Sequence, residues 1–297
     1  MVTLVGFLIV AVSVIGGYVL EGGHLHVLFQ PIELLIILGA AIGSIVASCS
    51  SSLIKSLVNN IVGILRPTKV NKDFYLDLLL LLHDLFKLFT QGPQEIEKHI
   101  ENPHESPLFL KFPQITKNRH LVSFLCNTMT LQLSVSVEPH NLEDLLDTDI
   151  KTMHDEEDLV PKTLFRVADA LPGLGIVAAV LGIVITMGKL AQGKETIGHS
   201  VAAALIGTFL GVLLSYGFFQ PLAAKIENKL LEEGKCFGVV KAGLLALSRG
   251  CNPKICIEFA RRSIPTEHRP SFTELEAAVR TSGGGAGAAS ASAKKAA

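Results

Sequence analysis

The stretch LPGLGIVAAVLGIVITMG, residues 171–188, carries no charged side chain and is built mainly from Gly, Ala, Leu and β-branched residues. As an α-helix it would be about 27 Å long, close to the roughly 30 Å hydrocarbon core of a bilayer. Stretches of similar length without Lys, Arg, Asp or Glu occur at Val2–Leu20, Leu34–Ile54, Ala170–Gly188 and His199–Phe219. The sequence therefore predicts an all-α membrane protein with four transmembrane helices in two hairpins.

The overall composition agrees with this prediction. The chain has 297 residues, of which 49% are hydrophobic and 18% charged, and a mean hydropathy of +0.45, which excludes an ordinary soluble protein. The first stretch has no Lys or Arg before it and no small-residue cleavage site, so we expect it to stay as a span. The net charge of −1 does not indicate a nucleic-acid partner.

The basic residues predict the orientation. Of 26 Lys and Arg, 12 lie from Lys55 to Arg166 and 12 from Lys225 to Lys295, whereas the turn at residues 21–31 has none. With four spans these two polar segments share one side, and the positive-inside rule makes that side the cytoplasm. We expect a multi-pass membrane protein with both large polar segments in the cytoplasm. Its five cysteines then face a reducing compartment or the membrane, which argues against disulfides.

The chain divides into five predicted segments. These are a first transmembrane hairpin (1–54), a cytoplasmic helical domain (55–169), a second transmembrane hairpin (170–222), cytoplasmic C-terminal helices (223–281) and a disordered tail (282–297). Residues 73–89 could be mistaken for a fifth span, but their four charges fall on one narrow stripe, which predicts an amphipathic helix with a wide buried face.

Nothing in the sequence indicates an enzyme, a cofactor or a metal site. Gly-rich stretches lie in the spans or the tail without a following Lys-Ser/Thr, and no Ser-His-Asp or Cys-His arrangement is evident. The pair Cys251 and Cys256 has no second pair or nearby His, and His24 with His26 forms only an isolated HxH. The acidic run 141–158 lacks the glycine turn of a calcium loop, so we interpret it as a solvated helix face.

The spans themselves lack an ion carrier. A proton path needs a carboxylate or histidine near mid-membrane. Here Glu33, Asp169 and His199 all lie at span ends. If this protein conducts ions, another chain must supply the carboxylate.

Spans three and four each carry a strip of small residues. Gly175, Ala179 and Gly182 lie on one face of span three, and Ala203, Gly207 and Gly211 recur every four residues in span four. Such strips allow close backbone approach by a partner helix. They could equally pack against each other within one subunit, and the pattern leaves both open.

Three further residues have two interpretations each. Pro172 and Pro221 lie near the cytoplasmic ends of the second hairpin. They are either ordinary residues of a first helical turn or parts of a flexible joint between membrane and cytoplasm. Thr208 is a hydroxyl deep in span four. It either bonds back to a carbonyl of its own helix or offers a polar point on an ion path.

Several local patterns together resemble one family, the A subunits of bacterial flagellar-motor stators (MotA). The similarity extends over the chain except the tail. The matching stretches are GGYVLEGG (16–23), QPIELLIILGAAIGS (30–44), YLDLLLLL (75–82), IENPHES (100–106), LPGLGIVAAVLGIV (171–184), GTFLGVLLSYGFFQPLA (207–223) and RPSFTELEAAVR (269–280).

The resemblance implies a homopentamer around two copies of a B subunit (MotB-like), each with one span that bears an essential aspartate. Ion flow past that aspartate would turn the ring, while residues 55–169 push on the rotor protein FliG. The second hairpin would line the ion path, and the complex would lie in the lipid of the bacterial inner membrane. The ion gradient supplies ~2.3 kcal/mol per elementary charge per 100 mV.

Individual residues match the family's functional positions. Pro172 and Pro221 match its two prolines and Thr208 its span-four threonine, whereas Ala179 stands where sodium-driven relatives carry threonine. A methyl group cannot replace a sodium ion's hydration shell, so we expect H⁺ as the transported ion.

The predicted rotor contacts match only in part. Glu97 matches the rotor-facing glutamate by its spacing from IENP. Phe89 stands where the family has an arginine, and Lys87 is the nearest cation.

Two other functions remain as alternatives. An ExbB- or TolQ-like energy-transducing unit would normally have three spans. A self-contained ion channel or transporter would conduct without a partner.

Overall fold

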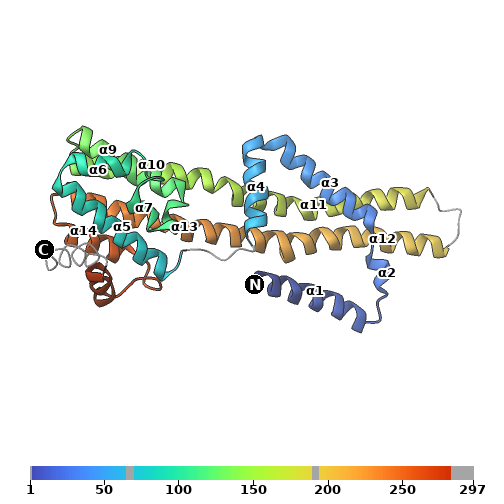
Figure 1. Cartoon of the computed structure of the whole chain (residues 1–297). Helices are drawn as coiled ribbons and strands as arrows, with labels where there is room; N and C mark the ends of the chain where they lie inside the picture. The colour runs from blue at the N-terminus through green and yellow to red at the C-terminus, as the bar shows by residue number, and fades with distance from the viewer. Residues whose placement is uncertain (1, 65–69, 189–193, 282–297) are drawn as a thin grey trace. The chain divides into compact units, whose positions relative to one another are not determined.

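The computed structural model describes residues 2–64, 70–188 and 194–281, and every regular element in these ranges is a helix (Figure 1). The predicted tail at 282–297 and residues 189–193, between the third and fourth spans, lie outside them. The chain forms two compact units. One comprises residues 1–67 and 156–230, and the other residues 68–155 and 231–297.

The first unit contains the long apolar helices. Its elements are α1 (Val2–Leu20), α2 (Leu25–Leu28), α3 (Pro31–Ser48), α4 (Ser51–Gly63), α11 (Leu159–Met187), α12 (Lys194–Val212), the π-helix η2 (Leu213–Phe219) and the start of α13 (Gln220–Ser248). Among the described residues, four helical segments are long and apolar enough to cross a membrane, which confirms the number of predicted spans.

Most of the side chains on these helices are exposed and apolar. On α1, Leu8, Ile9 and Val12 are each about 60% exposed. Apolar surface on this scale is unfavourable in water, and in a bilayer the lipid covers it. Only one face of α3 is buried, where Ile37 and Ala41 pack against α11 residues including Val167 and Leu171.

The predicted second span is wrong at its end. The apolar run continues to Ile54, but α3 ends at Ser48 and a separate helix starts at Ser51. The serines explain the break. The Ser48 hydroxyl donates to the carbonyl of Ser44 at 2.7 Å, and the Ser50 side chain accepts from the backbone N–H of Leu53 at 3.3 Å as an N-cap.

Pro172 is not a helix starter. It lies in the interior of α11, which begins at Leu159. Proline has no N–H to donate to the carbonyl four residues earlier, so an interior proline weakens the helix locally. This excludes the first of the two interpretations of Pro172.

The second unit is a helical domain with its own core. It contains α5 (Lys72–Gln91), α6 (Pro93–Ile100), α7 (Pro107–Leu110), α8 (Pro113–Thr116), α9 (Arg119–Ser134), most of α10 (Pro139–Glu157), most of α13, α14 (Pro253–Ser263) and a helix at 272–281.

The amphipathic helix predicted at 73–89 forms the centre of this core as α5. Its buried side chains are Phe74, Tyr75, Leu78, Leu79, Leu81, Leu82, Leu85 and Phe86, whereas none of its four charged stripe residues is buried. Each fully buried leucine contributes roughly 1.5–3 kcal/mol. Gly92, with a φ of 146°, ends α5 and allows the turn into Pro93.

Candidate functional site

The two helices of the second hairpin, α11 and α12, contact each other through their glycines. A methyl group added at Gly175 would lie 2.7 Å from the carbonyl oxygen of Gly207 and 3.1 Å from the Cα of Gly211. A methyl at Gly211 would lie 2.6 Å from the carbonyl of Leu171. The two backbones therefore touch, which larger side chains at these positions would prevent.

The small-residue contact continues toward the far end of the hairpin. A methyl at Gly182 would lie 3.1 Å from the Cβ of Ala204. Ala203 belongs to α12, but its side chain is outside the described part of the structure. The strips of spans three and four thus face each other within one chain.

Ala179 and Thr208 lie beside this glycine contact. The backbone nitrogen of Ala179 is 3.2 Å from a methyl placed at Gly207, and its side chain is buried. The Cα of Thr208 is 3.3 Å from a methyl placed at Gly175, and Thr208 is half-buried. The structure therefore brings both predicted ion-path residues to the same helix pair.

A hydrogen bond that was not predicted joins the two proline-bearing segments. Gln220, the residue before Pro221, donates from Nε2 to Oδ1 of Asp169 at 3.1 Å. Asp169 lies three residues before Pro172 on α11. This exposed bond connects the two proline-bearing segments.

A π-helix before Pro221 is the second missed feature. Over Leu213–Phe219 the helix widens, and the N–H of Gln220 donates to the carbonyl of Ser215, five residues earlier. Single π-turns inside α-helices frequently occur at functional sites. Pro221 is the sequence feature that could have indicated this π-helix, because in a regular α-helix the proline ring clashes with the carbonyl of residue 217.

The predicted rotor-contact residues lie in the second unit. Glu97 on α6 and Lys87 on α5 are both exposed. Phe89, at the position of the family's arginine, is half-buried and packs against the core of this unit. A phenylalanine here therefore belongs to the core.

Two buried cysteines of the second unit, Cys126 and Cys256, have thiols that burial makes less acidic. Burial raises the pKa of Cys126 to about 12 and that of Cys256 to about 11, with a smaller contribution to Cys256 from Cys251. A raised pKa keeps the thiol protonated and unreactive at neutral pH. These side chains act as packing groups.

Comparison with known proteins assigns most of the chain to one group. Residues 4–93 match the family described as Motility protein A N-terminal, and residues 117–235 match the MotA/TolQ/ExbB proton channel family. The chain is 40% identical to Motility protein A of Salmonella typhimurium and 39% identical to that of Escherichia coli, each over 94% of this chain and 95% of the relative.

Solved structures agree with the fold. A MotAB stator from Bacillus subtilis covers 90% of this chain and 97% of its own, with 21% identity and a TM-score of 0.69. The C. jejuni MotAB structure covers 91% and 98%, with 17% identity and a TM-score of 0.67.

Proposed function

We propose that this chain, which belongs to the MotA/TolQ/ExbB proton channel family, works with a MotB-like B subunit. It is a stator subunit of flagellar motility in the inner membrane and not an enzyme. In this proposal five copies surround a B dimer, and proton flow through the complex produces torque on the rotor protein FliG. The single observation that carries it is a set of four spans without a carboxylate near their middle.

The missing carboxylate supports the need for a B subunit. The carboxylates nearest to the spans, Glu33 and Asp169, lie at span ends, and the Asp169 side chain accepts a hydrogen bond from Gln220. A proton carrier near mid-membrane must therefore come from another chain. A single-span B subunit with an aspartate supplies it.

The position of the B helix stays a prediction. Gly175, Gly182, Ala203, Gly207 and Gly211 were expected to pack against it. Three of these glycines are already buried between α11 and α12. We propose that the B helix approaches along the outer edges of this contact.

Protons are the proposed ion because of Ala179. A sodium ion needs several oxygen ligands to replace its hydration shell. The side chain of Ala179 is a buried methyl group and offers none. The hydroxyl of Thr208 alone suits proton transfer better than sodium coordination.

The proposed coupling element is the pair Pro172 and Pro221. An interior proline allows a helix to bend at that point. The Asp169–Gln220 hydrogen bond would make the two helices bend together. Protonation of the B-subunit aspartate could then tilt both helices at once.

The proposed orientation puts residues 55–169 and 223–281 in the cytoplasm. This follows from the 22 basic residues in these two segments. The exposed Glu97 and Lys87 are then available to steer charged helices of FliG. Exposed charges are individually weak, so we expect several to act together.

Reconstitution in liposomes tests the proposal. Vesicles with this chain alone, with the B subunit, and with a B subunit carrying Asp→Asn in its span would each receive a pH gradient or a sodium gradient. We expect proton flux only with the intact pair and no sodium flux. Flux from this chain alone would instead show a self-contained channel.

A motility assay tests the coupling residues. We expect Pro172→Ala to reduce swimming while proton flux persists, since the proline is proposed to act after ion entry. The matched change Pro113→Ala, in a short helix of the second unit, should leave swimming intact. Equal swimming in both variants would contradict the coupling role.

A further inference from the structure

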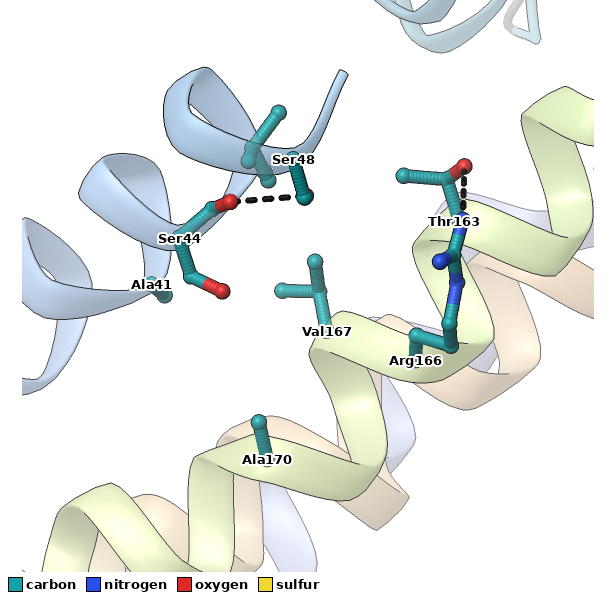
Figure 2. Close-up of a pocket in the computed structure, with 8 residues that line it drawn as sticks. Ala41, Ser44, Ser48, Thr163, Arg166, Val167 and Ala170 are labelled. Carbon is teal, nitrogen blue, oxygen red and sulfur yellow. Dashed lines mark hydrogen bonds between the residues drawn. The ribbon is translucent and has the colours of Figure 1, made fainter.

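A cavity of about 180 Å³ lies between the last turns of α3 and the segment of α11 before its apolar stretch (Figure 2). Ser44 and Ser48 line it from α3, and Thr163 and Arg166 from α11, with Ala41 and Ala170 as small walls. Its volume is far above the roughly 30 Å³ that one water molecule occupies in the liquid. We call it the Arg166 cavity.

The lining suits an anion. It contains one guanidinium and three hydroxyls but no carboxylate. Arg166 donates from a terminal nitrogen to the Thr163 hydroxyl at 3.1 Å, which holds the side chain beside the cavity. The other guanidinium N–H groups remain for a ligand, and Figure 2 shows the Ser44 hydroxyl directed into the space between the helices.

The surrounding carboxylates are committed elsewhere. Asp158 forms an ion pair with Lys162 at 3.3 Å, and Asp169 accepts from Gln220. Within the described part of the chain, no carboxylate forms an ion pair with Arg166. In this part of the chain its guanidinium therefore has no carboxylate partner, and a planar guanidinium matches phosphate oxygens in a bidentate geometry.

The cavity lies at the depth of lipid headgroups. Arg166 precedes Ala170, the start of the apolar stretch, by four residues, or about 6 Å along the helix. The headgroup layer extends roughly 5–7 Å beyond the hydrocarbon core on each side. Ser48 is the last residue of α3, so both walls leave the apolar region at this level.

The next helix supports this depth. On α4, Val58 and Val62 lie one turn apart and are 55% and 62% exposed, whereas Leu57 is buried. An amphipathic helix with exposed apolar side chains directly after a span is typical of the membrane interface. This surface indicates lipid beside the Arg166 cavity.

We propose that the Arg166 cavity binds the phosphate group of an anionic phospholipid. The guanidinium of Arg166 binds two phosphate oxygens, and the hydroxyl of Ser44 donates to the phosphate from α3. The lipid thereby bridges α3 and α11 six residues before Pro172. With the proposed orientation, the lipid belongs to the cytoplasmic leaflet.

Lipid binding to the intact purified complex tests the proposal by native mass spectrometry. Phosphatidylglycerol, phosphatidylcholine and inorganic phosphate would be titrated separately. We expect saturable binding of phosphatidylglycerol that Arg166→Gln weakens on the order of tenfold, because charge-assisted hydrogen bonds are lost. Ala170→Leu, which fills the cavity without a change in charge, should weaken it as well.

The matched control is Lys162→Gln, which removes one positive charge a single turn away on the same exposed helix face. We expect it to change binding by less than twofold. Equal losses in Lys162→Gln and Arg166→Gln would show only general charge attraction and overturn the site. Equal binding of phosphatidylcholine, or displacement of phosphatidylglycerol by millimolar inorganic phosphate, would overturn a site for anionic lipid.

Discussion

Alanine at Gly175 is the sharpest test of the contact between α11 and α12. The new methyl would lie 2.7 Å from the carbonyl oxygen of Gly207, about 0.7 Å short of the 3.4 Å at which ordinary van der Waals contact begins. The obstructing atom is backbone, so no side-chain rotation can relieve the clash. The helices must separate, which also opens the adjacent contact between Gly175 and Gly211.

Gly173→Ala provides a matched control on the same helix. No heavy atom lies within 4 Å of a methyl placed at Gly173. Both substitutions gain about 1 kcal/mol of helix propensity, so this gain cancels between them. Overpacking costs typically 1–3 kcal/mol, and the free energy of unfolding should therefore be lower in Gly175→Ala by about that amount.

The two variants would be compared by thermal unfolding of the purified protein in one detergent. Gly182→Ala should unfold at a temperature between those of the two variants, since its new methyl lies 3.1 Å from the Cβ of Ala204 rather than against a backbone carbonyl. If Gly175→Ala unfolds at the same temperature as Gly173→Ala, the backbone contact does not hold this hairpin together.

Three further predictions concern the second unit. Gly234→Ala should lower the free energy of unfolding by about 1 kcal/mol relative to Gly238→Ala in thermal melts, because the first methyl meets the imidazole of a histidine on α10 and the second meets nothing. Hydrogen bonds from two arginines lower the pKa of Glu258 from 4.5 to about 2, so its stabilisation is complete above pH 4.5 and is lost as the pH falls toward 2. Glu258→Gln should thus melt below wild type at pH 7, with a gap that closes near pH 2, and a gap independent of pH would contradict this. Lys241→Met should lower the free energy of unfolding by about 1–2 kcal/mol in low salt and by less in high salt, since the Lys241 ammonium lies 2.6 Å and 3.9 Å from two carboxylates of α10. The same change at the exposed Lys235 should leave the free energy of unfolding nearly unchanged.

The sequence predicted features that depend on periodicity along one helix. The charged stripe of residues 73–89 identified α5, because a 3.6-residue period separates its buried leucines from Asp73 and Asp84. The number of spans followed from length and hydropathy alone. Such signals need no knowledge of the partner helix.

Features that depend on a second helix could not be predicted from the sequence. The small residues at Gly175 and Gly207 predicted close approach, but a strip does not identify its partner, and in this chain each strip faces the other. The hydropathy pattern also predicted a second span that extends to Ile54. Hydropathy does not show that one helix ends at Ser48 and that Ser50 caps the start of the next.

The two prolines show how similar residues at similar depth occupy different structures. Pro172 lies in the middle of α11 and cannot donate to the carbonyl of Ala168, so the weakness is a missing bond in an α-helix. Pro221 follows the π-helix, where the N–H of Gln220 already donates five residues back. The wider turn leaves room for the proline ring beside the carbonyl of residue 217. The proposed joint would therefore be asymmetric, because α11 lacks a hydrogen bond at Pro172 whereas the fourth span changes helix type before Pro221. The Asp169–Gln220 bond connects the two segments.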